Sequence, residues 1–179
     1  MNETFDASEI EVYNEVFSKE DFKQINNFLR RPLWGYGNIS HPKDEAIPFF
    51  TMSFRDEPFF NDYCLSRICD VLGKKYKLRD CYANGHIFGT QGSPHQDAPS
   101  KDYYTFLLYS NQVGPDIRKW KPQWGGKTVF FLNEEEHHYV LPKPNTGTLF
   151  PSNIFHYAES TTRHFSGLRM SVAWKLITQ

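Results

Sequence analysis

Close to its C-terminal end the sequence reads Leu168-Arg169-Met170-Ser171-Val172-Ala173-Trp174. Every second residue of this stretch, from Leu168 to Trp174, is apolar, and on an extended chain Arg169, Ser171 and Ala173 share the opposite side. The pattern predicts a strand over 168–177 with an arginine on its inner face. Because a buried guanidinium is unfavourable without an anion, we expect Arg169 to bind an anionic ligand in a cavity. The alternative is that Arg169 is exposed or pairs with an acidic side chain of the chain itself.

The region before this strand has a similar β texture. Turn signals such as Gly92-Ser93-Pro94 and Trp124-Gly125-Gly126 interrupt it, and a further turn lies at 142–147. We therefore expect strands at 80–88, 103–110, 127–132, 137–141, 147–150 and 154–158.

The N-terminal part of the chain predicts two helices. Ser18 can cap the first helix, which must end before Pro32. Pro58 favours the start of the second helix and Gly73 its end. A strand containing Phe50 and Met52 is expected between them. Two helices followed by seven or eight short strands predict an α+β fold with a sandwich or barrel as its catalytic body, and 179 residues fit a single domain, 1–179.

Composition excludes several classes of function. The chain has 20 basic and 21 acidic residues and a net charge of −1, which gives no electrostatic basis for binding nucleic acid or a membrane surface. Cys64, Cys69 and Cys81 are odd in number and form no Cys-x-x-Cys pair, so we expect reduced cysteines in a cytoplasmic protein. The N-terminal residues lack the basic and apolar stretches of a signal peptide, and no segment has the apolar length of a membrane span.

A metal site is predicted from His95-Gln96-Asp97. Residues two apart on an extended chain point the same way, so an imidazole and a carboxylate converge. His156 is the best third ligand. Two histidines and one carboxylate leave three open positions on an octahedral ion, as in non-haem Fe(II) oxygenases. Zinc accepts the same ligands, so a zinc hydrolase stays open from the triad alone.

These motifs together resemble the 2-oxoglutarate/Fe(II) oxygenases and, within them, the prolyl 4-hydroxylase-like branch. The resemblance covers about 79–176. It rests on the order and spacing of several motifs taken together. Its anchors are Cys81-Tyr82, His95-Gln96-Asp97, the stretch 106–111, Trp124-Gly125-Gly126-Lys127-Thr128, Leu149-Phe150-Pro151, His156 and Gly167-Leu168-Arg169-Met170-Ser171. It implies a double-stranded β-helix, a distorted cupin-like jelly roll, with a core at about 79–177 and supporting N-terminal helices.

The resemblance also implies roles for individual residues. It gives His95, Asp97 and His156 to Fe(II), and it gives Arg169 to the distal carboxylate of 2-oxoglutarate. The remaining co-substrate positions are Tyr109, Ser171, Tyr82 and Thr128. No catalytic side chain is implied beyond these ligands. The implied cofactors are Fe(II), 2-oxoglutarate and O2, with ascorbate as a reductant in vitro, and the co-substrate leaves as succinate and CO2.

A departure from the family pattern leaves two alternative site residues open. The interval from His156 to Arg169 is longer than usual, so Arg163 competes for the carboxylate and His164 for the metal. We prefer Arg169 because Arg163 lies in a predicted turn. His137 and His138 adjoin an acidic run, and we expect them to be exposed.

The substrate is predicted by analogy only. A prolyl residue in a protein or peptide leads, and a free amino acid or other small molecule follows. A metal-binding cupin without oxygenase activity, whether isomerase, hydrolase or binding module, is the alternative of another class. The insertion 112–124 is either a substrate lid, with Arg118, Trp120 and Trp124 as contacts, or a packed surface loop. Residues 38–48 are expected to form the opposite wall.

Overall fold

The computed structural model describes residues 4–40, 47–110 and 119–179. The strands form two antiparallel sheets. The large sheet has seven strands in the order β1-β8-β5-β10-β4-β3-β2, and the small sheet has three in the order β7-β6-β9. The strands are β1 (Glu11–Asn14), β2 (Gly35–Asn38), β3 (Phe49–Ser53), β4 (Tyr76–His86), β5 (Tyr103–Tyr109), β6 (Thr128–Phe131), β7 (His137–Val140), β8 (Thr146–Pro151), β9 (His156–Ala158) and β10 (Arg169–Thr178).

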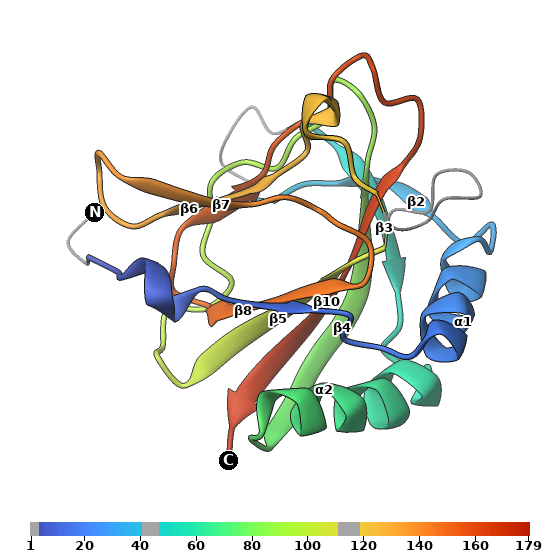
Figure 1. Cartoon of the computed structure of the whole chain (residues 1–179), viewed down its shortest axis with the longest axis vertical. Helices are drawn as coiled ribbons and strands as arrows, with labels where there is room; N and C mark the ends of the chain where they lie inside the picture. Colours follow the sequence, from blue (N-terminus) through green and yellow to red (C-terminus); the bar gives the residue numbers. More distant parts are fainter. Residues whose placement is uncertain (1–3, 41–46, 111–118) are drawn as a thin grey trace.

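The two sheets pack face to face, as Figure 1 shows for β6 and β7 opposite β8 and β5. Apolar side chains from both sheets form one cluster between them, in which Tyr109 and Phe150 of the large sheet meet Phe130 and Val140 of the small sheet. Two facing antiparallel sheets with strands that cross between distant parts of the chain make a jelly-roll-like sandwich.

Helices cover the outer face of the large sheet (Figure 1). They are α1 (Lys19–Leu29), a π-helical segment η2 (Phe59–Cys64) and its continuation α2 (Leu65–Leu72), and short 3-10 turns lie at η1 (Ala7–Glu9) and η3 (Pro122–Trp124). Ile25, Phe60 and Ile68 from the helices pack against Trp174 and Cys81 of the sheet in a second core cluster. The large sheet is therefore buried on both faces, and β10 lies in its middle.

Local sequence explains where the helices begin and end. The Ser18 side chain accepts a hydrogen bond from the backbone N–H of Asp21, 3.1 Å away, and so caps α1. The helix ends at Leu29, three residues before Pro32. Gly73 follows α2 in the left-handed conformation, at φ 63°, which a residue without a side chain adopts readily. No helix among the described residues is long and apolar enough to cross a membrane.

The predicted elements are confirmed with small shifts in their bounds. The strand expected at 80–88 starts earlier and ends earlier, at Tyr76–His86. The second helix follows Pro58 as predicted, but its first turns are π-helical. Strands β1 and β2 were not predicted. Cys64 and Cys81 are buried, Cys69 is half-buried, and all three are free thiols.

Candidate active site

Three side chains from separate parts of the chain can hold a metal ion. His95 and His156 exchange backbone hydrogen bonds of 3.1 and 3.0 Å across an isolated antiparallel bridge. The Asp97 N–H donates to the Ser152 carbonyl at 2.8 Å. The possible ligand atoms of the two histidines and Asp97 all lie within 4.8 Å of one another. The triad named from the sequence is thus assembled by the strand pairing.

Backbone carbonyls orient both imidazoles. His95 Nδ1 lies 2.8 Å from the Ser93 carbonyl and His156 Nδ1 lies 3.0 Å from the Ile154 carbonyl. A carbonyl oxygen only accepts, so each Nδ1 must carry the proton. Each Nε2 is then left with a free lone pair, and both Nε2 atoms point toward Asp97, at 3.5 and 3.6 Å from its carboxylate oxygens. This is the tautomer that metal-ligating histidines need.

The charge state of the triad also suits a cation. Burial lowers the pKa of His156 to about 4, against the opposing effect of Asp97, so the imidazole is neutral near pH 7. Burial alone would raise the pKa of Asp97, but Lys175 and His156 outweigh it and hold that pKa well below its usual range. The set therefore includes a neutral imidazole at His156 and an ionised carboxylate at Asp97.

Arg169 lies at the other end of the same cavity and is 1% exposed. Its Nε donates to the Gly126 carbonyl at 2.8 Å, and one terminal nitrogen donates to the Thr128 hydroxyl at 3.0 Å. The Ser171 hydroxyl lies 3.4 Å from the other terminal nitrogen. Among the described residues no carboxylate forms an ion pair with Arg169. The groups that contact the Arg169 guanidinium directly are neutral, so its positive charge is available to a ligand.

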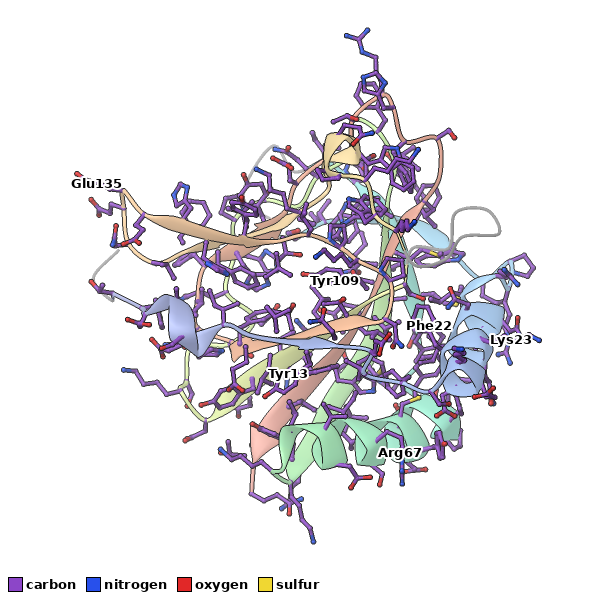
Figure 2. All side chains as sticks on the ribbon, in the orientation of Figure 1. Tyr13, Phe22, Lys23, Arg67, Tyr109 and Glu135 are labelled. Atoms are coloured by element: carbon purple, nitrogen blue, oxygen red, sulfur yellow. The ribbon has the colours of Figure 1, made fainter. Side chains whose placement is uncertain are left out.

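Three of the four other residues assigned to the co-substrate lie around Arg169. Tyr82, the fourth, lies nearer the metal triad, with its ring centre 5.5 Å from Lys175 Nζ. Tyr109 is fully buried in the interior between the sheets, as Figure 2 shows, and its hydroxyl donates to Thr128 at 2.8 Å. The Arg169 guanidinium carbon is 5.5 Å from the centre of the Tyr109 ring. Thr128, Ser171 and Tyr82 line the cavity directly, whereas Tyr109 lies behind Thr128 and orients it.

A cavity of about 520 Å³ joins the triad to Arg169. Its inner wall is formed by alternate residues of β4 and β10, which pair in antiparallel register: His86 with Arg169, Asn84 with Ser171 and Tyr82 with Ala173. The outer rim includes Asn38, Ile39 and Ser40, so this part of the expected 38–48 wall does line the cavity. Ile47 and Pro48 do not line it, and 41–46 lie outside the described residues.

Sequence reasoning missed three polar residues of this wall. The His86 Nδ1 and Asn84 Oδ1 atoms are buried and have no hydrogen-bond partner among the described residues. Burial lowers the pKa of His86 to about 3, with Arg169 acting in the same direction, so His86 is neutral. Lys175, the third, forms an ion pair with Asp97. Alternation with Tyr82 on β4 and with Ala173 on β10 was the signal that could have found them.

These features fit Fe(II) and a 2-oxo dicarboxylate. Two imidazoles and one carboxylate form the donor set that leaves open positions on Fe(II). Buried polar atoms without partners next to an unneutralised arginine match an anionic, oxygen-rich ligand.

Other residues singled out from the sequence lie away from the cavity. Trp120 and Trp124 do not line it; they pack against Phe165, with ring centres 4.8 and 5.4 Å from that ring. Arg118 and the 112–118 part of the expected lid lie outside the described residues. A substrate contact through these residues stays a prediction.

The rivals for the co-substrate and metal sites are on the surface. Arg163 and His164 are both exposed in a turn and neither lines the cavity. His137 is exposed and His138 is half-buried at the start of β7. The geometry therefore favours Arg169 and His156 over Arg163 and His164.

No family model matches the sequence, and no curated protein matches it closely enough to count as a relative. Solved structures do match the fold. A 2OG-Fe(II) oxygenase family oxidoreductase from Burkholderia pseudomallei superimposes with a TM-score of 0.71 at 13% identity, over 96% of this chain and 86% of its own.

Two further matches have different activities. A prolyl hydroxylase from Trichoplax adhaerens, in complex with a hypoxia inducible factor peptide fragment, gives a TM-score of 0.65 at 17% identity, over 96% of this chain and 84% of its own. A non-haem α-ketoglutarate-dependent epimerase from nogalamycin biosynthesis gives 0.67 at 11% identity, over 94% and 77%. The chain therefore has the jelly-roll-like fold of the 2-oxoglutarate/Fe(II) oxygenases, prolyl hydroxylases among them.

Proposed function

We propose that the chain is an Fe(II)- and 2-oxoglutarate-dependent dioxygenase with a double-stranded β-helix, which hydroxylates an unactivated C–H bond. One observation carries the proposal: a His-Asp-His triad and a buried arginine without an acidic partner among the described residues line one cavity. When bound, Fe(II) supplies the chemistry by which O2 and 2-oxoglutarate give succinate, CO2 and a hydroxylated substrate.

The protein's own contribution is binding and placement. His95, Asp97 and His156 hold the ion and leave three of its positions open. Arg169 holds the distal carboxylate of 2-oxoglutarate, with Ser171 and Thr128 as hydroxyl neighbours and Tyr109 fixing Thr128 from behind. Alternate residues of β4 and β10 line the wall on which the co-substrate would lie.

Arg169 also separates this proposal from the alternative of another class. A metal-binding cupin that acts as an isomerase, hydrolase or binding module needs no cation at the inner end of the cavity. Burying a guanidinium among neutral hydroxyl and carbonyl groups is unfavourable unless a ligand uses its charge.

For the substrate we propose a prolyl residue of a protein or peptide. The peptide-bound prolyl hydroxylase with the same fold supports this choice, and the epimerase supports a small molecule as the second candidate.

Thermal unfolding with Mn(II), an ion that does not support turnover, tests the co-substrate site. A ligand at 100 times its dissociation constant stabilises the folded state by about 2.7 kcal/mol. We expect 2-oxoglutarate to raise the melting temperature of the Mn(II) protein, and Arg169→Met to abolish the rise. Arg163→Met, on the exposed turn, is the matched control and should keep it. An equal rise in wild type and Arg169→Met would refute the assignment of Arg169.

Succinate release tests the substrate. Peptides containing proline should raise the rate above the level without substrate, and free amino acids should not. If a free amino acid stimulates release and the peptides do not, the small-molecule candidate replaces the prolyl one.

A further inference from the structure

Strand β10 carries a second buried cation, Lys175, which the proposed function does not use. Lys175 is 6% exposed and lies on the cavity side of β10, on the same face as Arg169, Ser171 and Ala173. A lysine is rarely buried unless its charge is paired.

The partner of Lys175 is the metal-binding carboxylate itself. The ammonium group forms an ion pair with Asp97 Oδ2 and lies 3.3 Å from the Thr105 hydroxyl oxygen. Thr105 in turn donates a hydrogen bond to the same Oδ2 at 2.6 Å. A carboxylate oxygen has two lone pairs, so Oδ2 is fully occupied by these two donors.

The other oxygen of Asp97 is in a different position. Oδ1 faces His95 Nε2 at 3.5 Å, and among the described residues neither lysine nor threonine contacts it. Oδ2 also lies 3.6 Å from His156 Nε2, so each oxygen faces one histidine. The two oxygens are nevertheless unequal before any ion binds, because only Oδ2 is held by Lys175 and Thr105.

We propose that Lys175 is a positioning residue that restricts Asp97 to one-oxygen binding of the metal and so keeps a coordination position open for 2-oxoglutarate. The inference rests on the proposed function, because an open position matters only if a bidentate co-substrate must fill it. Lys175 also neutralises the buried carboxylate in the metal-free chain, which would otherwise hold an uncompensated charge.

A merely structural ion pair predicts the opposite effect on the metal. Removing an ordinary hydrogen-bonding partner of a metal ligand weakens metal binding by roughly 10- to 100-fold. Lys175 is a cation, so its removal relieves repulsion of the ion and frees the second oxygen of Asp97. Lys175→Met should therefore bind Co(II) more tightly than wild type, by about tenfold at the short range involved.

The affinity for 2-oxoglutarate should fall in Lys175→Met, whereas the affinity for Co(II) rises. If Asp97 takes the ion with both oxygens, it occupies a position that 2-oxoglutarate needs. We expect the Co(II) form of Lys175→Met to bind 2-oxoglutarate about tenfold or more weakly than the wild type. Lys175→Arg keeps a cation at the position and should stay close to wild type for both ligands.

The experiment is an anaerobic titration of the whole chain with Co(II) and then with 2-oxoglutarate, followed by the visible absorption of the ion. Lys77→Met replaces an exposed lysine on neighbouring β4 and is the control. Tighter Co(II) and weaker 2-oxoglutarate binding in Lys175→Met supports the proposal. Weaker Co(II) binding, or unchanged 2-oxoglutarate binding, overturns it.

Two further outcomes can be distinguished from these: a variant that does not fold, and a failure of the proposed function itself. If Lys175→Met does not fold, Thr105→Val frees one lone pair of Oδ2 and should weaken 2-oxoglutarate binding to a smaller degree; wild-type behaviour of this variant overturns the proposal. If wild-type Co(II) protein binds no 2-oxoglutarate, the proposed function fails, and the Co(II) affinity of Lys175→Met alone decides whether Lys175 restrains Asp97.

Discussion

Arg169 and Lys175 are buried on the same face of β10 but have different neighbours. Lys175 is paired with Asp97, whereas Arg169 touches only neutral oxygens among the described residues. A buried cation with an acidic partner is stable by itself, and one without it stays unfavourable until an anion arrives. We therefore expect a carboxylate ligand to bind beside Arg169.

The metal assignment is tested best at His95. Its side chain is 22% exposed, so His95→Ala removes a ligand at little cost to packing. We expect this variant to keep its fold and to lose Co(II) binding and turnover, as measured by titration and succinate release. His164→Ala, in the exposed turn, should retain both. Wild-type metal affinity in His95→Ala would contradict the triad.

His86 should make the metal-free protein sensitive to acid. Burial, with Arg169 beside it, lowers the pKa of its imidazole from 6.5 to about 3. Below pH 6.5 the unfolded chain binds a proton that the folded chain does not, so stability falls as pH falls toward 3, by up to about 1.4 kcal/mol per pH unit.

Urea unfolding of the metal-free protein at pH 7, 6 and 5 measures this effect. His86→Gln has no titrating group at the position and should lose less stability over that interval than wild type. Parallel losses in the two proteins would mean that His86 is not kept neutral by folding.

At the scale of elements, β8 passes close to β5 and to the chain before α1. A Cβ added at Gly147 would clash with the Phe106 ring and lie 2.9 Å from Val16 Cγ2. Both neighbours are buried, and neither can move without disturbing the core. Strand β8 can pair here only because residue 147 has no side chain.

Gly147→Ala should therefore destabilise the protein by about 1–3 kcal/mol, the usual effect of overpacking. Gly35→Ala on β2 is the control, because its added Cβ would have no neighbour closer than the Thr51 carbonyl at 3.9 Å. Chemical unfolding measures both. Equal stability of the two variants would contradict the close approach of β8.

Strands that are buried on one or both faces could be predicted from the sequence. Turn signals and β texture placed β5 and β7, and alternation placed β10, each within one or two residues. Strands β1 and β2 were missed because they are the edges of the large sheet. Gly35–Asn38 is exposed at every position, so no hydrophobic pattern distinguishes it from a loop.

The candidate site could also be predicted only in part. His95, Asp97 and Arg169 follow from local spacing and alternation. The Lys175 contact could not be predicted, since Asp97 reaches β10 only through the strand pairing of the folded chain. Alternation with Ala173 could place Lys175 on the inner face of its strand, but a lysine near the end of a strand is usually exposed, and the sequence does not show that this one is buried against Asp97.

At the scale of the molecule, the helices and the small sheet have separate tasks. Helices α1 and α2 pack on the outer face of the large sheet and support its central strands, where the Trp174 indole donates to the Phe60 carbonyl at 3.0 Å. The small sheet covers the inner face and brings His156 to His95. The central strand β10 thus carries both Arg169, which lines the cavity, and Lys175, the partner of Asp97.

The central claim is that one cavity binds Fe(II) and 2-oxoglutarate together. The most direct measurement is the visible spectrum of the metal-free protein mixed anaerobically with Fe(II) and then with 2-oxoglutarate. The account predicts a weak charge-transfer band that appears only when both are present, and that needs far more 2-oxoglutarate in Arg169→Met. A protein that binds Fe(II) but gives no band at any concentration of 2-oxoglutarate would contradict it.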